Sequence, residues 1–126
     1  MLAALLLSAA AAACADWHGQ ATGHYLGQVE SQGPKAVDTW IEAAPGGALT
    51  GFYMLHEPNR DVRGTLDYLG DDGCDVALFR WTDLYGTGIA RLRFYPEQRC
   101  FEGAWGLESV RSALYWRSCA QAAVTS

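Results

Sequence analysis

Aromatic side chains are the residues of this sequence best suited to bind a ligand. The chain holds five tryptophans, six tyrosines and four phenylalanines among 126 residues. Aromatic faces can stack on a bound group, although rings at strand spacing also fill protein cores. The residues that we predict to line a binding site are six aromatics and one histidine: Trp40, Phe52, His56, Tyr68, Trp81, Trp105 and Trp116.

His56 is the one histidine with a polar neighbourhood that could bind. It is expected at the end of a strand, next to Glu57, Asn59, Arg60 and Asp61, and at the same end as Asp83 and Tyr85. Together these residues could line the mouth of a barrel; the alternative is a solvated loop. His18 and His24 are not at a recognised metal spacing, so we expect no metal site.

Motifs for catalysis are missing from the sequence. It has no Gly-x-Ser-x-Gly elbow, phosphate loop or His-Glu-x-x-His motif. The run Asp71-Asp72-Gly73 with Asp75 lacks the length and the terminal Glu of a calcium-binding EF-hand loop. We therefore expect a protein that is not an enzyme and uses no cofactor.

The last two β-like runs, residues 100–106 and 112–119, predict a hairpin with a defined register. Pairing around Ser109 or Val110 sets Cys100 opposite Cys119 and Glu102 opposite Arg117. The same register puts Phe101, Trp105, Leu114 and Trp116 on one face, with Gly103 leaving room beneath the Trp116 ring.

This register predicts the disulfide. Directly opposed antiparallel positions are close enough for Cys100 and Cys119 to be bridged. Cys74 is then the expected unpaired thiol. The rival pairing, Cys74 with Cys100, would have to cross an intervening strand.

The N-terminal residues 1–13 predict a secretory signal peptide. Their apolar run is too short to span a bilayer but fits a signal h-region before small residues. Ala11-Ala12-Ala13-Cys14 resembles a bacterial lipobox, which implies lipidation of Cys14 and a membrane anchor. Cleavage after Ala13 or Ala15, releasing an unlipidated protein, is the alternative. Either route predicts export, to the periplasm or to the outer membrane as a lipoprotein.

Charge argues against nucleic acid as a partner. The formal net charge is −5, and the basic residues do not cluster. The acids dominate residues 14–79, whereas six arginines lie in residues 80–126.

Short β-rich runs separated by turn signals predict an all-β fold. The expected strands cover residues 22–30, 37–43, 48–56, 62–69, 74–83, 89–95, 100–106 and 112–119. Uniformly short connections favour an eight-stranded antiparallel up-and-down meander closed as a small barrel. Around Tyr85-Gly86 we expect Phe79 to face Leu92 and Trp81 to face Ala90, all pointing inward.

The resulting domain plan is a signal peptide (1–13), a tether (14–21), a β-barrel domain (22–119) and a C-terminal tail (120–126). In a meander, odd strands start where even strands end. All four cysteines are therefore expected at one end of the barrel.

Three segments carry a resemblance to a known family. Gly47-Ala48-Leu49-Thr50-Gly51-Phe52-Tyr53 resembles the G-x-L-x-G-x-Y hairpin of avidin-type, calycin-like barrels. Residues 23–29 and 79–83 resemble two further strands of that family. The position of the biotin-binding Asn is Gly27 here, so the resemblance implies the architecture and not biotin binding. Residues 101–105 and 115–117 also resemble small exported bacterial barrels.

The sequence thus predicts an exported, lipid-anchored binding barrel without catalytic activity. Its expected partner is a small apolar ligand or an envelope protein. Two alternatives remain: a structural envelope lipoprotein with a solid core, and an inhibitor of a periplasmic enzyme. An interior cavity of about 300 Å³ or more would favour a small ligand.

Overall fold

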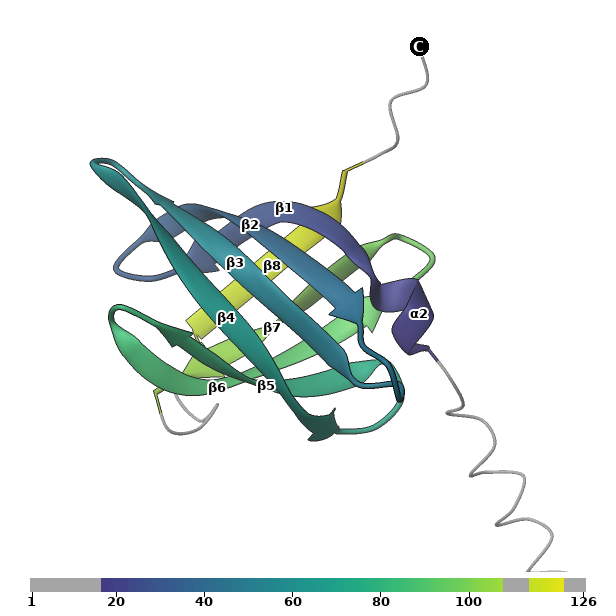
Figure 1. Ribbon diagram of the computed structural model, residues 1–126. Coiled ribbons are helices and arrows are strands. Elements are labelled where there is room, and N and C mark those ends of the chain that lie inside the picture. Colours follow the sequence, from purple (N-terminus) through teal and green to yellow (C-terminus); the bar gives the residue numbers. More distant parts are fainter. Residues whose placement is uncertain (1–16, 108–113, 122–126) are drawn as a thin grey trace, which may run out of the picture.

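The computed structural model describes residues 17–107 and 114–121, which form an eight-stranded antiparallel barrel (Figure 1). The strands follow one another in chain order, and β1 pairs with β8 to close the barrel. The elements are α2 (His18–Ala21), β1 (Gly23–Glu30), β2 (Pro34–Ala43), β3 (Leu49–Glu57), β4 (Arg60–Asp71), β5 (Val76–Asp83), β6 (Gly86–Tyr95), β7 (Cys100–Gly106) and β8 (Leu114–Ala120). The predicted meander is confirmed.

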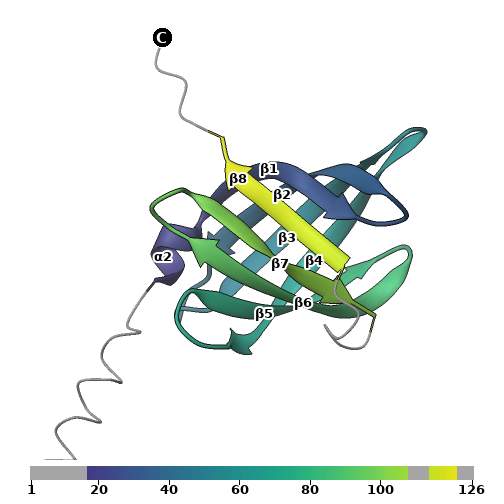
Figure 2. The ribbon, with the colours of Figure 1, turned by 180° about the vertical axis from the view of Figure 1, so that it is seen from behind.

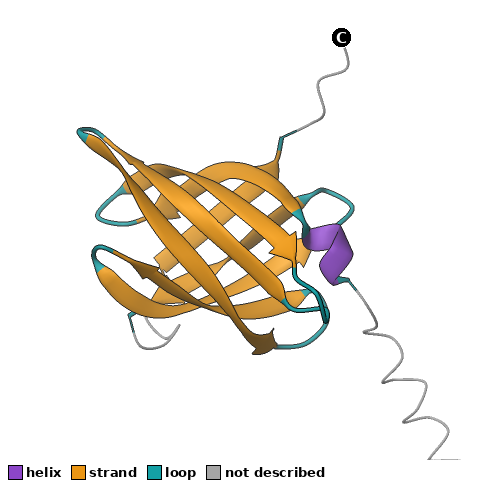
Figure 3. Ribbon diagram, in the orientation of Figure 1, coloured by secondary structure: helices purple, strands orange, loops and turns teal. Residues whose placement is uncertain are grey.

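Closing the barrel removes the edges of the sheet. A meander left open would expose the unpaired backbone groups of two edge strands. Here β8 lies between β7 and β1, which Figure 2 shows from behind. All eight strands therefore have two neighbours, and helix α2 stands at one end (Figure 3).

Buried and exposed side chains alternate along each strand, and the buried ones form the core. In β4, for example, Val62, Gly64 and Leu66 are buried, whereas Arg63 and Thr65 between them are exposed. This period of two is what a sheet with one buried face requires. The inward side chains fill the barrel along most of its length.

The two ends of the barrel differ. We call the end with α2 and the turns at 44–48, 72–75 and 96–99 the plugged end, and the opposite end the mouth. At the plugged end the Trp17 ring packs 5.5 Å from the Phe94 ring, and Tyr25 donates a hydrogen bond of 2.6 Å to the Ala21 carbonyl. Burial raises the pKa of Tyr25 to about 12.

Residues 17–21, which we expected to belong to a tether, are thus part of the barrel. Trp17 is 6% exposed and Ala21 1%. A one-turn helix followed by extended Thr22 turns the indole back over the core, so this segment acts as a plug. Residues 14–16 of the expected tether and the expected signal peptide lie outside the described residues, and so do residues 122–126 of the expected tail.

The register of the last hairpin is confirmed, with Cys100 facing Cys119, Glu102 facing Arg117 and Gly103 facing Trp116. The reason for the glycine differs from the prediction. A Cβ at Gly103 would lie 1.9 Å from the Arg91 carbonyl oxygen on β6, so the neighbouring backbone, not the Trp116 ring, requires it.

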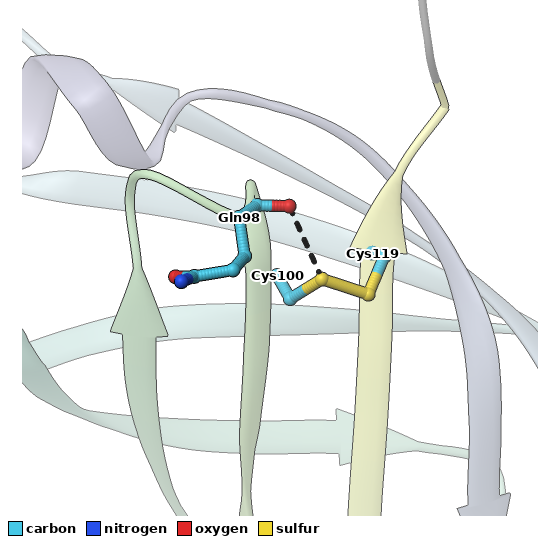
Figure 4. Close-up of a disulfide and its surroundings, with 3 residues drawn as sticks. All are labelled: Gln98, Cys100 and Cys119. Carbon is cyan, nitrogen blue, oxygen red and sulfur yellow. Dashed lines mark hydrogen bonds between the residues drawn. A yellow bond between two sulfur atoms is a disulfide. The ribbon is translucent and has the colours of Figure 1, made fainter.

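Cys100 and Cys119 form the predicted disulfide, with an S–S bond of 2.02 Å between β7 and β8 (Figure 4). The Gln98 carbonyl oxygen lies 3.3 Å from the Cys100 sulfur. A disulfide sulfur carries no hydrogen, so this is a contact and not a hydrogen bond. The bridge fastens the last strand at the plugged end.

The prediction that Cys74 is an unpaired thiol is wrong. Cys74 is disulfide-bonded, and its partner is not among the described residues. The three described cysteines do lie at the plugged end, as the meander requires: Cys74 is in the β4–β5 turn, Cys100 starts β7 and Cys119 is near the end of β8.

The predicted β5–β6 register is wrong by two residues. Phe79 faces Ala90 and Trp81 faces Gly88. A side chain at residue 88 would meet the Trp81 indole, since a Cβ there would lie 2.7 Å from Trp81 Nε1. A slip of two residues keeps the same face inward, so the predicted inward residues of β5 and β6 are still correct.

Candidate functional site

The seven predicted ligand residues lie in three different places. Trp81, Trp105 and Trp116 share one pocket at the mouth. Trp40, Phe52 and His56 project from the outer face of β2 and β3, opposite in phase to the buried Thr39, Ile41, Tyr53 and Leu55. Tyr68 lies near the plugged end. The first group alone forms a hollow site.

The mouth pocket has a volume of about 60 Å³. Its described walls come from five strands and two turns, and its lining is mostly aromatic: Val29, Ser31, Tyr53, Leu55, Trp81, Asp83, Tyr85, Trp105 and Trp116. Sequence reasoning missed Tyr53 as a lining residue. Tyr53 lies two residues from both Gly51 and Leu55 on the same strand, and side chains two residues apart point to the same face, so this spacing was the signal that Tyr53 points inward.

Tyr53 reaches the pocket because β4 has a glycine opposite it. Tyr53 and Gly64 are register partners, and a Cβ at Gly64 would lie 2.0 Å from the Tyr53 ring. The ring therefore lies across β4, and its hydroxyl donates a 2.6 Å hydrogen bond to the Asp83 carboxylate on β5. Burial, together with this carboxylate, raises the pKa of Tyr53 well above its usual range.

A second glycine admits the Trp81 indole. The indole crosses Gly88, and its Nε1–H donates to the Gly106 carbonyl at 3.0 Å. Trp105 closes the adjacent wall, donating from Nε1–H to the Glu30 carbonyl at 3.1 Å. The two indoles meet edge to face, with ring centroids 5.2 Å apart and planes at 88°.

Trp116 forms the wall toward β8. It is 3% exposed and meets the Tyr53 ring edge to face, with centroids 5.2 Å apart. Its Nε1–H is buried and has no acceptor among the described residues. The mouth is therefore lined by ring pairs that meet at nearly right angles, and space remains between these pairs.

Among the described residues, Asp83 is the one formally charged residue that lines this pocket. One carboxylate oxygen accepts the Tyr53 hydroxyl, and the other accepts the Tyr85 backbone N–H at 2.8 Å. Two donors on different elements thus hold the carboxylate in place.

Charged groups at the rim are paired with one another. Glu57 contacts Lys35 Nζ at 2.7 Å and Arg60 Nε at 3.6 Å, and it accepts the Tyr85 hydroxyl at 2.5 Å. The Lys35 ammonium, followed by the Tyr85 hydroxyl, lowers the pKa of Glu57. The Arg60 guanidinium carbon lies 6.0 Å from the Tyr85 ring centroid. These contacts hold Tyr85 at the edge of the pocket.

Four planar side chains stack in a row across the outer face of β1 to β4, and we call this row the outer ladder. They are His24, Trp40, Phe52 and Arg63. The His24 and Trp40 rings are stacked 4.4 Å apart at 8°, and the Trp40 and Phe52 rings 4.7 Å apart at 13°. The Arg63 guanidinium lies 4.3 Å from the Phe52 centroid. Each planar group packs directly against the next, so this arrangement stabilises the sheet and leaves no pocket inside the stack.

His56 lies beside the outer ladder rather than in the mouth. Its ring contacts the Asp61 carboxylate at 3.0 Å and the Asp38 carboxylate at 2.8 Å. Hydrogen bonds from the His56 ring to the Asp61 carboxylate, then to that of Asp38, raise the pKa of His56. His24 contacts the same Asp38 at 3.3 Å. Nowhere in residues 17–107 and 114–121 do three or more His, Cys, Asp or Glu residues form a group suited to a metal ion.

Tyr68 belongs to a polar cluster near the plugged end. Its hydroxyl donates to Asp71 at 2.7 Å, and its ring packs edge to face against His18. Burial and the Asp71 carboxylate raise the pKa of Tyr68 to about 12. His18 also bonds the Gly47 carbonyl, so this cluster helps to attach α2 to the barrel.

Comparisons with known protein families, with curated proteins and with solved structures find no match for this chain. The closed eight-stranded barrel agrees with the architecture that the avidin-type resemblance implies, and a family relationship stays an expectation. Within the described residues no helix is long and apolar enough to cross a membrane.

Proposed function

We propose that the chain is an exported, non-catalytic binding barrel whose mouth pocket receives one side chain of a protein partner. The observation that carries this proposal is the small aromatic pocket around Trp81, Trp105 and Trp116, whose rings project from strands of the barrel. Aromatic-lined concave sites with a few placed polar groups are the usual form of binding sites.

The size of the pocket favours a protein partner over a free apolar ligand. Its volume of about 60 Å³ is well below the roughly 300 Å³ at which drug-sized ligand pockets begin. The barrel interior below it is filled by buried side chains such as Phe79, Leu92 and Phe101. One anchoring side chain in a desolvated pocket is the usual form of a binding hot spot.

Export is supported by two observations. The signal-like residues 1–13 are one, and the disulfide bonding of Cys74, Cys100 and Cys119 is the other. Disulfides persist in secreted and periplasmic proteins and are rare in the cytosol.

The membrane anchor at Cys14 remains a prediction from sequence, because Cys14 lies outside the described residues. Palmitate labelling of the wild type and of Cys14→Ser tests it: label in the wild type alone supports the anchor, and equal label or none contradicts it.

A structural envelope protein with a solid core is the second candidate, and the filled interior favours it. Site-specific photocrosslinking in the exporting cell separates the two. A photoreactive residue replacing Tyr85 at the mouth should give one discrete protein adduct. The same residue replacing Thr65, exposed on the outer face of β4, should not. No adduct from either position, or equal adducts from both, would reject the mouth as a binding site.

A further inference from the structure

In the described part of the chain, the lining of the mouth pocket combines five aromatic side chains with one carboxylate. The rings are Tyr53, Trp81, Tyr85, Trp105 and Trp116, and the carboxylate is that of Asp83. The face of an aromatic ring carries negative electrostatic potential, which attracts cations. A formal negative charge in the same wall adds to that attraction in a partly desolvated site.

Most polar hydrogens of the rings are already used. The Tyr53 hydroxyl, the Trp81 N–H and the Trp105 N–H donate to Asp83, to the Gly106 carbonyl and to the Glu30 carbonyl. These walls can therefore offer an occupant their π faces and C–H edges rather than hydrogen-bond donors. Among the described lining residues, only the Trp116 N–H and the Ser31 hydroxyl are left to donate to an anion, which would also meet the Asp83 carboxylate.

Ring orientation distinguishes between the two kinds of cation that proteins present. A planar guanidinium stacks on a ring face, and Arg63 does this on Phe52 at the outer ladder. The mouth rings meet at 88° and 79°, so they surround a compact volume instead of a flat slot. An ammonium group is compact and suits this shape.

We infer that the mouth pocket is an aromatic cage for an alkylammonium group, and that in the protein complex this group is a lysine side chain of the partner. Asp83 supplies the charge and the rings supply cation–π contacts, as in cages that recognise ammonium ligands. The inference rests on the proposed function, because it specifies which side chain of a partner enters the mouth.

The five tryptophan indole N–H signals of the chain provide the test. Trp81, Trp105 and Trp116 report on the pocket, whereas Trp17 at the plugged end and Trp40 on the outer ladder are internal controls. In ¹H–¹⁵N spectra, n-butylammonium should shift the three pocket signals and leave the two controls in place. The uncharged n-pentanol should bind at least about tenfold more weakly, since it lacks the cation–π and charge terms.

Two charge variants sharpen the test. Asp83→Asn keeps an acceptor for the Tyr53 hydroxyl and should weaken n-butylammonium binding by about tenfold. Asp61→Asn removes the same charge from an exposed outer position and should leave binding unchanged. The comparison of n-butylammonium with n-pentanol on the wild-type protein needs no variant, so it holds even if Asp83→Asn unfolds.

The outcomes separate this inference from the proposed function. Selective shifts with n-butylammonium support the cage. Equal shifts with n-pentanol overturn the cage and leave an apolar binding pocket. No shifts with either probe overturn both. Tighter binding of phosphocholine than of n-butylammonium would assign the site to a lipid headgroup and overturn the lysine as occupant.

Discussion

The mouth pocket and the outer ladder are built from the same kinds of side chain and lead to opposite results. Both place aromatic rings across neighbouring strands. In the outer ladder the rings are nearly parallel and 4.4–4.7 Å apart, so they fill the space between them. At the mouth the pairs are perpendicular and 5.2 Å apart, and a pocket remains.

Glycines account for much of this difference. At the mouth, Gly64 and Gly88 let the Tyr53 and Trp81 rings lie across the neighbouring strand. In the outer ladder Trp40 has Phe52 as its register partner, so each ring packs against another ring. A pocket in a small barrel thus depends on where side chains are missing as much as on which rings are present.

The largest effect is expected from removing a mouth ring. Trp81→Ala should lower the free energy of unfolding by about 4 kcal/mol, because a buried, hydrogen-bonded indole is replaced by a cavity. Urea denaturation measures it. A loss no greater than that of Trp40→Ala would show that the mouth and the outer ladder are energetically equivalent.

A smaller effect is expected from filling the space under Tyr53. Gly64→Ala should cost about 3 kcal/mol, because the new methyl group forces the ring away from β4. The Tyr53–Asp83 hydrogen bond should be lost as well, which lowers the tyrosine pKa in an ultraviolet titration. Thr65→Ala, on the exposed face of the same strand, is the control. If both variants titrate like the wild type, the ring does not depend on the glycine.

Breaking the outer ladder should cost less. Trp40→Ala removes two stacked contacts on a half-buried surface, with an expected loss of about 1–2 kcal/mol. Because the outer ladder has no pocket, the n-butylammonium shifts at Trp81, Trp105 and Trp116 should stay as in the wild type. A changed affinity would mean that the two regions are coupled through the sheet.

The smallest effect is a pH dependence beside the outer ladder. The pKa of His56 is raised above 6.5 by Asp61 and Asp38, so its contribution to stability is complete below about pH 6.5 and is lost as the pH rises through the folded-state pKa. The urea midpoint of the wild type should therefore fall between pH 6 and pH 8 relative to His56→Gln. Parallel pH profiles of the two proteins would contradict this.

The sequence predicted the parts of the fold in which several residue pairs of one hairpin favour the same register. In the last hairpin a cysteine pair and an opposite-charge pair favour one register, and the structure has that register. In the β5–β6 hairpin the run Gly86-Thr87-Gly88 allows several turn positions. The contact that decides among them joins Trp81 to Gly106 on β7, which no local pattern reveals.

The candidate site was predicted in part for the same reason. Trp81, Trp105 and Trp116 lie in phase with buried neighbours and do line the mouth. Trp40 and Phe52 lie out of phase with Ile41 and Tyr53, and alternation alone would have placed them outside. Trp17 was missed because the short helix that turns it into the core has no capping side chain or apolar period to mark it.

The pairing of β1 with β8 also has a kinetic consequence. Seven of the eight strand pairings join neighbours in sequence and need only short loops to close, whereas Tyr25 and Ala120 come from opposite ends of the barrel domain. Closing so long a loop carries the largest entropic cost, so we expect this pairing to form last and to limit the folding rate. The Gln121 N–H donates to the His24 carbonyl, which shows how close the two ends lie. A circular permutant that links residue 121 to residue 22 and opens the chain in the β3–β4 turn would make the β1–β8 pairing local and the β3–β4 pairing long-range, so β3 and β4 should then pair last.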